Sequence, residues 1–478
     1  MKKTYYYFHL LILINIFHAE DNIYKIKFGL LNEKNFDIDS DLINNIFYNR
    51  IYLNLSIGTS VQTVPFELDN EVQTFCVTNY VFNANESSTY ENISKKEIEI
   101  YYEVPRKGYL SKDILNIDGK SEKINFILGT QFPYRISKLG IIGLRIPHLI
   151  QDCVFPFFHS LKDAELLNSL IWTLKFYDNM SLFDQVTYDK NKKNTIGEFI
   201  FGGEPSKYEN DSHKYNDKSY YTINPSPSLD IRLWKFDFSK IYITLKEGEN
   251  LTQIEYEEDK TAEIMIKYSF ISGPQYFLYF LEEHYLYLPM VDGLCTEEVI
   301  DSYTYIECDS SFKPETFQNI SFEQRGFEYT FNLTYEDLFV FDQKKQKYIF
   351  LIFIRDNSDI WELGTIFLRK FQFVFNENSQ SIGIYKYYEG VDKDDKDKRG
   401  DNPDNDNSNI MKIVLIISLS VIFAVLLILT GMFIQKKICN KDRKKRANEL
   451  KDNFVYESEN TDENGLAINS EKKIIKEG

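Results

Sequence analysis

The chain has 478 residues, enough to bury a large hydrophobic core in one to three domains. Its 43% hydrophobic residues exclude a disordered or low-complexity protein, and its 34 Tyr and 38 Phe favour strands, because aromatic side chains fit half-buried pleated surfaces. The net charge of −17 argues against nucleic-acid binding, which requires an excess of Lys and Arg on the binding face.

The N-terminus has the pattern of a secretory signal peptide. Two lysines follow Met1 and precede the apolar run YYYFHLLILINIF, and Ala19 is a small residue at which a signal peptidase could cut. We therefore expect residues 1–19 to be a signal peptide, with a buried N-terminal strand or helix as the alternative. Residues 20–48 lack strong periodicity and are interpreted as either a pro-like segment or a first strand.

Residues 49–388 show the pattern of a large all-β domain, with many short apolar or alternating runs separated by turn residues. The expected strands include the runs YLNLSIG, TVPFELD, IEIYYEV, EFIFGG, KIYITL, YIFLIFI and FQFVFN. Few stretches favour a helix, and the best candidates are QYFLYFLEEHY and the region around AELLNSL.

The C-terminal part predicts a single membrane span. Residues 389–409 are dense in charge, Asn and Gly and are expected to form a solvated stalk. Residues 413–434 carry no charge over 22 positions, long enough for a transmembrane helix. Seven Lys and Arg follow within QKKICNKDRKKR, which marks the cytoplasmic side, so residues 435–478 are expected to be a cytoplasmic tail.

Sequons and cysteines agree with this type I topology, which would place the β domain outside the cell or in the lumen of the secretory or endolysosomal system. The N-x-S/T motifs all precede the span and begin at Asn54, Asn85, Asn92, Asn179, Asn210, Asn250, Asn319 and Asn332. Cys76, Cys153, Cys295 and Cys308 lie in the outer part, where disulfides persist. Cys439 lies in the basic segment, as a candidate for palmitoylation or as an unmodified thiol.

An ordered series of motifs between residues 51 and 386 resembles the pepsin-like aspartic proteases. The run IYLNLSIGTSVQTVPFELDNEVQTFCV is similar to the strand, I-G-T-P-x-Q turn and L-D-T-G-S-S loop of the first lobe in that family. Further similarities follow in the family's order: Ser87-Ser88-Thr89-Tyr90, Tyr102, Gly108, Asp113, Gly140-Ile141-Ile142-Gly143-Leu144, the strand GEFIFGG, Trp234, and the stretch from Trp361-Glu362-Leu363-Gly364 to Ile382-Gly383.

The resemblance implies an all-β, bilobal fold with lobes at about 49–225 and 226–388. It also implies that Tyr102 is the tyrosine of the flap hairpin and that Cys295 and Cys308 form a disulfide of the second lobe. No cofactor is implied.

The resemblance further implies a proteolytic centre in which each lobe contributes one aspartate. Two neighbouring carboxylates share a proton, so that one acts as base towards water and the other as acid towards the peptide carbonyl. Asp69 matches the first aspartate, but Asn70 and Glu71 follow it where the family has Thr and Gly. Counting back from the run SFISGP places the second D-T-G on Met265-Ile266-Lys267. A thioether neither takes nor gives a proton.

Two interpretations of the altered loops follow. Asp69 is read as a hydrogen-bonding residue of an Asx-type turn rather than as an acid or base. Glu71 and Lys267 occupy equivalent positions where the family has glycines, and we hypothesise that they form an ion pair across the former active site, in the place of the catalytic water.

Other chemistries find less support. The six His residues show no metal-ligand spacing, so no metal site is expected. His148 and His159 flank an apolar stretch with Cys153, for which a buried thiol or a disulfide to Cys76 is favoured over a Cys–His pair. The favoured function is that of an inactive homologue binding a peptide, protein or glycan ligand between its lobes. An active membrane-bound endopeptidase and a structural surface glycoprotein are the alternatives.

Overall fold

The computed structural model describes residues 22–32, 42–99, 107–131, 139–147, 155–177, 181–182, 195–211, 214–215, 219–223, 233–258, 260–324 and 329–385. All of them belong to the first of two units, Met1–Tyr387, and the second unit begins at Tyr388. The expected signal peptide, stalk, span and tail lie outside the described residues. Within the described part of the chain, no helix is long and apolar enough to cross a membrane.

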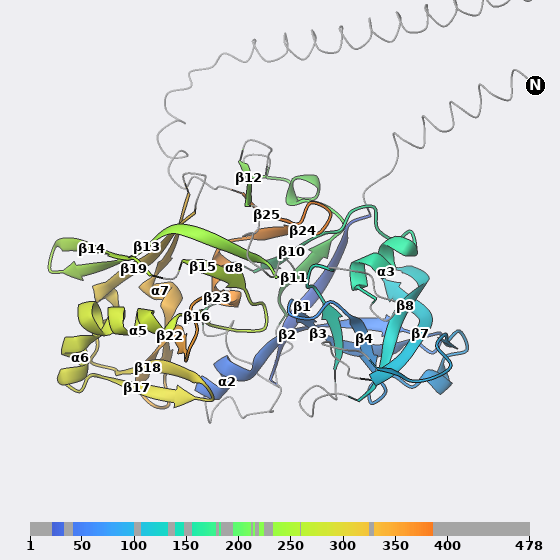
Figure 1. Ribbon diagram of the computed structural model, residues 1–478, viewed down its shortest axis with the longest axis horizontal. Helices are drawn as coiled ribbons and strands as arrows, with labels where there is room; N and C mark the ends of the chain where they lie inside the picture. The colour runs from blue at the N-terminus through green and yellow to red at the C-terminus, as the bar shows by residue number, and fades with distance from the viewer. Residues whose placement is uncertain are drawn as a thin grey trace, which may run out of the picture. The chain divides into compact units, whose positions relative to one another are not determined.

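Most described residues lie in two large β-sheets, which Figure 1 shows side by side. The first sheet runs in the order β12-β25-β24-β10-β11-β1-β2-β3-β9-β4-β8-β7-β5, with β6 on β7. Its strands are β1 Tyr24–Asn32, β2 Asn49–Ile57, β3 Gln62–Asp69, β4 Phe75–Thr78, β5 Glu91–Asn92, β6 Ile98–Glu99, β7 Lys107–Ile117, β8 Lys120–Gln131, β9 Gly140–Gly143, β10 Ile171–Phe176, β11 Thr195–Phe201, β12 Tyr220–Ile223, β24 Phe373–Asn376 and β25 Ser381–Tyr385.

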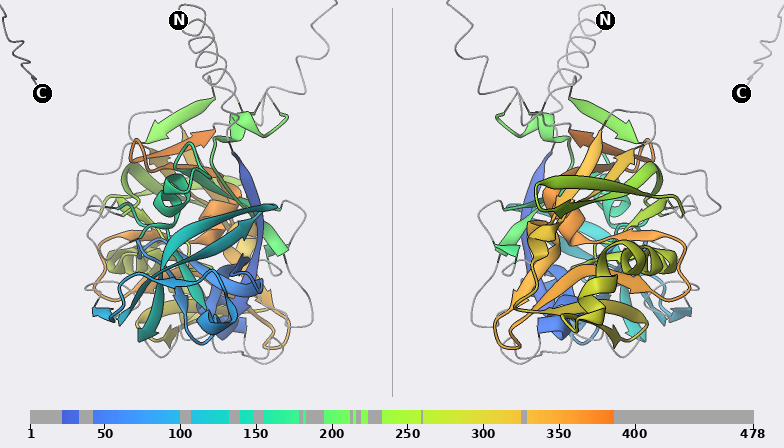
Figure 2. Two further views of the ribbon diagram at one scale, coloured as in Figure 1. Left: turned by 90° about the vertical axis from the view of Figure 1, so that its right-hand side faces the viewer. Right: turned by 90° about the vertical axis from the view of Figure 1, so that its left-hand side faces the viewer.

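The second sheet runs in the order β17-β18-β22-β16-β23-β15-β13-β19-β20, with β14 on β13 and β21 on β22. Figure 2 shows the two ends of the molecule, one formed by the first sheet and the other by the second. The strands of the second sheet are β13 Lys235–Glu247, β14 Asn250–Tyr256, β15 Thr261–Ile264, β16 Ile271–Gly273, β17 Cys295–Ile300, β18 Tyr303–Asp309, β19 Phe317–Gln324, β20 Thr330–Thr334, β21 Phe339–Asp342, β22 Lys347–Arg355 and β23 Trp361–Leu363.

The helices are short. They are α2 Leu42–Tyr48, α3 Phe157–Asp163, α5 Gln275–Leu281, α6 Tyr287–Val291, α7 Tyr335–Leu338 and α8 Thr365–Lys370. The predicted helix QYFLYFLEEHY is confirmed as α5 and the π-helical turn Glu282–Leu286 that follows it. The prediction around AELLNSL was wrong: α3 ends at Asp163, and residues 164–170 form turns and irregular chain.

The first and last parts of the described chain meet in the first sheet, in the neighbouring strands β24, β10, β11, β1 and β2, which are called the central layer here. Strand β1 pairs with β2 and β11, so residues 24–32 form the first strand that was one of two alternatives for this segment. Strand β24, close to the end of the described chain, pairs with β10. The rings of Trp172 and Phe375 stack with centroids 3.9 Å apart, and Trp234 packs edge-on against Phe375 at 5.1 Å. These buried aromatic residues hold the central layer together.

Both sheets repeat one local arrangement, in which a strand ends in a loop that returns to the same sheet. Strand β3 runs parallel to β9, and β4 then pairs with β9 in the antiparallel direction. Strand β15 runs parallel to β23, and β16 then pairs with β23 in the antiparallel direction. The two loops between these strands, residues 69–74 and 265–270, therefore occupy equivalent places in the two lobes. They are named loop 1 and loop 2 below.

The predicted disulfide is confirmed, because Cys295 and Cys308 are bonded across β17 and β18. Cys76 is buried in β4, whereas Cys153 lies outside the described residues, so a bond between them stays a prediction. The sequon at Asn179 also lies outside them. Glycosylation at the described sequons stays a prediction as well.

Candidate functional site

The register of the strands shows which residue of loop 2 corresponds to Asp69. In the first lobe Leu68 lies opposite Ile142, and in the second lobe Ile264 lies opposite Leu363. The residue after each pair begins the loop, namely Asp69 in loop 1 and Met265 in loop 2. The returning strands agree: Phe75 lies opposite Ile142 and Ile271 opposite Leu363, so both loops have the same length. Met265 thus stands where the sequence count placed it.

Two glycines show how closely the loops pack against their sheets. Gly143 follows the β9 position opposite Leu68, and Gly364 follows the β23 position opposite Ile264. A Cβ atom at Gly143 would collide with the backbone of loop 1, and a Cβ atom at Gly364 would collide with the backbone of Phe270. Both positions need glycine because another part of the chain lies against them.

Asp69 is half-buried at the end of β3. Its Oδ1 accepts a hydrogen bond of 2.8 Å from the backbone N–H of Glu71, which is the Asx-type contact that the sequence predicted. Burial raises the pKa of the Asp69 carboxyl above its ordinary value, and the positive charge of Lys267 opposes that effect. Met265 is fully buried, and its backbone N–H donates to the carbonyl of Leu363 at 3.0 Å.

Asn70 locks the two loops together. Its side chain is completely buried, its Nδ2 donates to the carbonyl oxygen of Ile264, and its Oδ1 accepts from the backbone N–H of Ile266 at 3.1 Å. One amide therefore satisfies a donor and an acceptor of the opposite lobe. This role could not be expected from the sequence, in which Asn70 shows only as the loss of the hydroxyl residue that joins the loops in pepsin-like proteases.

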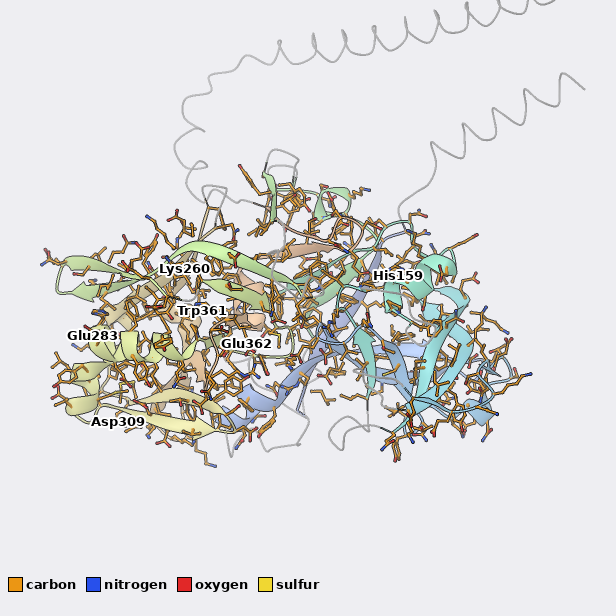
Figure 3. The ribbon with its side chains drawn as sticks, in the orientation of Figure 1. His159, Lys260, Glu283, Asp309, Trp361 and Glu362 are labelled. Atoms are coloured by element: carbon orange, nitrogen blue, oxygen red, sulfur yellow. A yellow bond between two sulfur atoms is a disulfide. The ribbon has the colours of Figure 1, made fainter. Side chains whose placement is uncertain are left out.

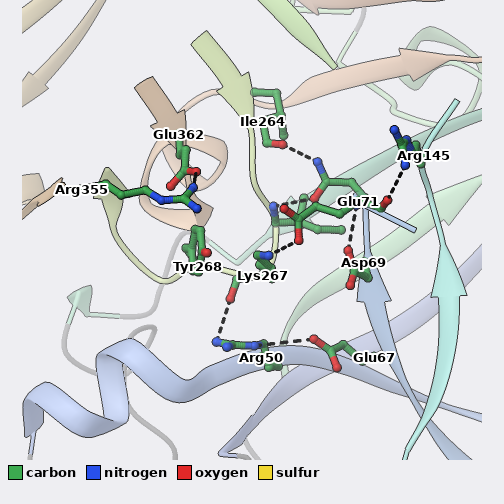
Figure 4. A network of polar contacts seen from close by, with 12 residues as sticks. Arg50, Glu67, Asp69, Glu71, Arg145, Ile264, Lys267, Tyr268, Arg355 and Glu362 are labelled. Carbon is green, nitrogen blue, oxygen red and sulfur yellow. Dashed lines mark hydrogen bonds and ion pairs between the residues drawn. The ribbon is translucent and has the colours of Figure 1, made fainter. Parts of the chain in front are cut away.

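Glu71 and Lys267 form the expected ion pair. The Nζ of Lys267 donates to Oε2 of Glu71, joining loop 1 to loop 2 (Figure 4). The Lys267 side chain is 19% exposed and that of Glu71 is 41% exposed, so the pair is open to water on one side. Burial would lower the pKa of Lys267, but the neighbouring Tyr268, Glu71 and Asp69 outweigh it and raise that pKa above its usual range. Lys267 is therefore a fixed positive charge.

Two arginines hold the backbone on either side of this pair. Nη1 of Arg50 donates to the carbonyl of Lys267 at 3.1 Å, and its Nε lies 3.6 Å from Oε1 of the buried Glu67. Nη1 of Arg145 donates to the carbonyl of Glu71 at 3.3 Å. Figure 4 shows both contacts, one below and one beside the loops. Each loop is thus braced by a cation as well as by the opposite loop.

The second lobe adds buried acids that no sequence motif indicates. Glu362 occupies the second position of Trp361-Glu362-Leu363-Gly364, where the family motif W-I-L-G has an aliphatic residue; its carboxylate pairs with Arg355 and accepts from the hydroxyl of Tyr303 at 3.3 Å. Glu263, the register equivalent of Glu67, lies 3.3 Å from Nζ of Lys235. Burial raises the pKa of Glu263 to about 7, against the effect of Lys235.

Other predicted site residues stay apart from the loops or lie outside the described chain. Tyr102, the predicted flap residue, falls between β6 and β7 in a segment that is not described. His148 and Cys153 are likewise outside, and the described His159 lies 3.8 Å from Oε2 of Glu377. Figure 3 shows His159 in the first lobe, away from Trp361 and Glu362 of the second. No group of three or more His, Cys, Asp or Glu among the described residues could hold a metal ion.

Comparison with known sequences agrees with this geometry. The sequence model for the eukaryotic aspartyl protease matches residues 56–387. The chain belongs to this family. It is 26% identical to renin of Ovis aries over 372 residues, covering 72% of this chain and 81% of the renin. It is 23% identical to renin of Canis lupus familiaris over 72% of this chain and 80% of the renin, and 24% identical to plasmepsin IV of Plasmodium falciparum over 74% of this chain and 72% of that protein.

That loops 1 and 2 correspond to the elements that carry the two aspartates in an aspartyl protease stays a prediction of the motif order. Here the two equivalent positions hold Asp69 and Met265, and the positions two residues on hold Glu71 and Lys267. On that prediction, one carboxylate, one thioether and one ion pair stand where the family has two carboxylates that share a proton.

Proposed function

We propose that this aspartyl protease homologue is catalytically inactive and binds a peptide, protein or glycan ligand at the face between its lobes. The observation that supports this most is the Glu71–Lys267 ion pair between the two loops. It joins side chains at two positions where the family has glycines, next to Asp69 and Met265. The region of an active site is thus occupied by a structural contact.

The chemistry of peptide hydrolysis explains why these substitutions remove activity. The reaction needs one carboxylate to accept a proton from water and a second carboxyl to donate one to the carbonyl. Met265 supplies neither function, because a thioether is at most a weak acceptor. Asp69 remains as a single carboxyl, whose pKa burial raises while the positive charge of Lys267 acts in the opposite direction.

The membrane anchor is part of the proposal. It rests on the signal-like residues 1–19, the uncharged residues 413–434 and the basic residues that follow. A type I orientation would present the two-lobed unit outside the cell or in the lumen of the secretory or endolysosomal system.

A cleavage assay tests the inactivity directly. The full chain, purified in a mild detergent, is incubated with denatured globular protein between pH 3 and 6, with and without pepstatin, an inhibitor of aspartic proteases. We expect no pepstatin-sensitive cleavage. Cleavage that pepstatin blocks and that Asp69→Ala abolishes would show that the alternative, an active endopeptidase, is correct. A protein that neither cleaves nor captures a ligand would instead be a structural glycoprotein.

Restoring the family residues tests the assignment of the loops. The variant with Glu71→Gly, Met265→Asp, Ile266→Thr and Lys267→Gly rebuilds two carboxylates without the ion pair, and we expect it to bind pepstatin. Adding Asp69→Ala to the same variant is the matched control and is expected to abolish that binding. If the restored protein folds but binds no pepstatin, loops 1 and 2 are not the remnants of the catalytic loops.

A further inference from the structure

One helical segment of the second lobe is apolar on more than its buried side. Residues 275–291 form α5, a π-helical turn and α6 as one continuous helical arm. Phe277, Leu281 and Leu286 are buried against the core. A surface helix normally has polar residues on its other side, and a helix that is apolar all round is normally covered.

The outer side of this arm exposes a cluster of aromatic and aliphatic side chains. Ten large hydrophobic residues are exposed among the described residues, and six of them fall within residues 276–299. These six, named the arm patch here, are Tyr276, Tyr279, Tyr287, Leu288, Val291 and Val299, with exposures from 54% to 69%. The rings of Tyr276 and Tyr279 contact each other, with centroids 6.4 Å apart. Exposed apolar surface marks interaction sites, and tyrosine is enriched at protein interfaces.

The arm patch is placed on a firm support at one end of the molecule. Val299 lies on β17, which is the edge strand of its sheet, and the Cys295–Cys308 bond fixes β17 to β18. Figure 1 shows α5, α6 and β17 together at the end of the second lobe, away from the first sheet. A rigid surface loses little conformational entropy when a partner binds to it.

The segment that carries the arm patch is acidic, although its buried Glu307 pairs with Lys345 and Lys347 from the neighbouring turn and strand. Residues 275–312 contain eight Asp and Glu and no Lys or Arg. Figure 3 shows two of these acids, Glu283 and Asp309, at the same end of the lobe. Burial and the neighbouring carboxylate of Glu297 raise the pKa of Glu282 to about 7. A neighbouring cation would relieve this repulsion between carboxylates. The same 38 residues contain no Asn, so no N-linked glycan is attached within them.

We propose that the arm patch binds a basic amphipathic segment of a partner protein, in which apolar side chains alternate with Lys or Arg. The apolar residues would pack on the tyrosines and on Leu288 and Val291, while the cations would meet the surrounding carboxylates and the tyrosine rings. A second copy of this chain fits poorly, because a two-fold interface would place the acidic surface against itself. An anionic lipid surface is repelled for the same reason. This proposal does not depend on whether the protein is catalytically inactive.

A defined peptide tests the proposal on the full chain. The probe is a short helical peptide of Leu and Lys with one apolar and one basic face. Its two controls are a Leu–Glu peptide of the same pattern and a Gly–Lys peptide of the same charge. We expect only the Leu–Lys peptide to bind tightly, with an affinity that falls as salt rises. Hydrogen–deuterium exchange should show protection concentrated in residues 275–299.

Matched variants decide whether the arm patch is the site. Leu288→Ser with Val291→Ser should weaken binding by about tenfold or more, since central apolar anchors carry most of an interface's affinity. Val61→Ser with Leu251→Ser removes equally exposed side chains elsewhere and should have no effect. Glu297→Gln with Glu298→Gln should weaken binding, whereas Asp118→Asn with Glu122→Gln, exposed acids of the first lobe, should not.

Three results would overturn the proposal. The first is an equal loss of binding in the control variants, which would mean that the peptide follows only the overall negative charge. The second is equal binding of the Leu–Glu peptide or of lipid vesicles, which would mean that the patch is a general apolar surface. The third is a dimer that Leu288→Ser with Val291→Ser disrupts, which would make a second copy the occupant.

Discussion

Replacing Asn70 is the sharpest perturbation of the contact between the two lobes. Its amide satisfies the carbonyl of Ile264 and the N–H of Ile266, and all three residues are completely buried. Asn70→Ala leaves both backbone groups without that partner and away from water. Each buried group that loses its partner costs about 1–3 kcal/mol, so we expect the free energy of unfolding to fall by about 2–6 kcal/mol. That is a large share of a typical domain's stability of about 5–15 kcal/mol.

Equilibrium urea unfolding, followed by tryptophan fluorescence, measures this loss. Trp172, Trp234 and Trp361 are buried, so their emission reports the folded core. Asn70→Thr restores the hydroxyl that the family uses at this position and should recover part of the loss. Thr63→Ala, an exposed substitution on β3, the strand that leads into loop 1, should change stability by no more than about 0.5 kcal/mol. If the Asn70→Ala protein is as stable as the Thr63→Ala protein, the hydrogen bonds of Asn70 do not hold the two loops together.

Three further predictions concern charge and the disulfide. A double-mutant cycle of Glu71→Gln and Lys267→Met should give a coupling free energy of about 1 kcal/mol or less, because Glu71 is 41% exposed; a much larger coupling would contradict the solvent-open geometry. Burial raises the pKa of Glu377 to about 8, above its unfolded value of about 4.3, so its contribution to stability is complete below that unfolded value and is lost as the pH rises through 8. The free energy of unfolding should therefore fall as the pH rises from about 4.3 to 8, and Glu377→Gln should reduce that fall in urea titrations at a series of pH values. The same fall in the variant as in the unmodified protein would contradict this. Replacing Cys295 and Cys308 by Ser opens a link between residues 13 positions apart and should cost about 3 kcal/mol in the same assay; stability equal to that of the oxidised protein would contradict this.

The bilobal fold could be predicted because its signals are local and ordered. Short motifs such as Gly140-Ile141-Ile142-Gly143-Leu144 mark positions where the chain passes very close to itself, and such positions tolerate few residues. The equivalence of Asp69 and Met265 followed from counting along the chain, and the strand register places both residues at the start of equal loops. The ion pair followed from the same count, since equivalent loop positions face each other.

The remaining site contacts could not be predicted, because they depend on partners chosen by the tertiary structure. An Asn after an Asp in a turn is read as a local turn residue, and nothing nearby shows that Asn70 reaches Ile264 and Ile266. Glu362 looks like a charged residue in an apolar strand until Arg355 and Tyr303 are seen beside it. The helix expected around residues 164–170 failed for a similar reason: Leu166, Leu167 and Leu170 are all buried, but in irregular chain.

The substitutions in loops 1 and 2 act together, so reverting Met265 alone is not expected to restore catalysis. Met265→Asp alone would place a second carboxylate at the equivalent register position, so both members of the pair would be present. Lys267 would still lie beside them, with a pKa that Tyr268, Glu71 and Asp69 raise against the effect of burial, and its positive charge would favour the ionised form of both aspartates. A shared proton is what the mechanism requires, so we expect this single variant to show no pepstatin-sensitive cleavage. Activity from Met265→Asp alone would show that the ion pair does not control the protonation of the loops.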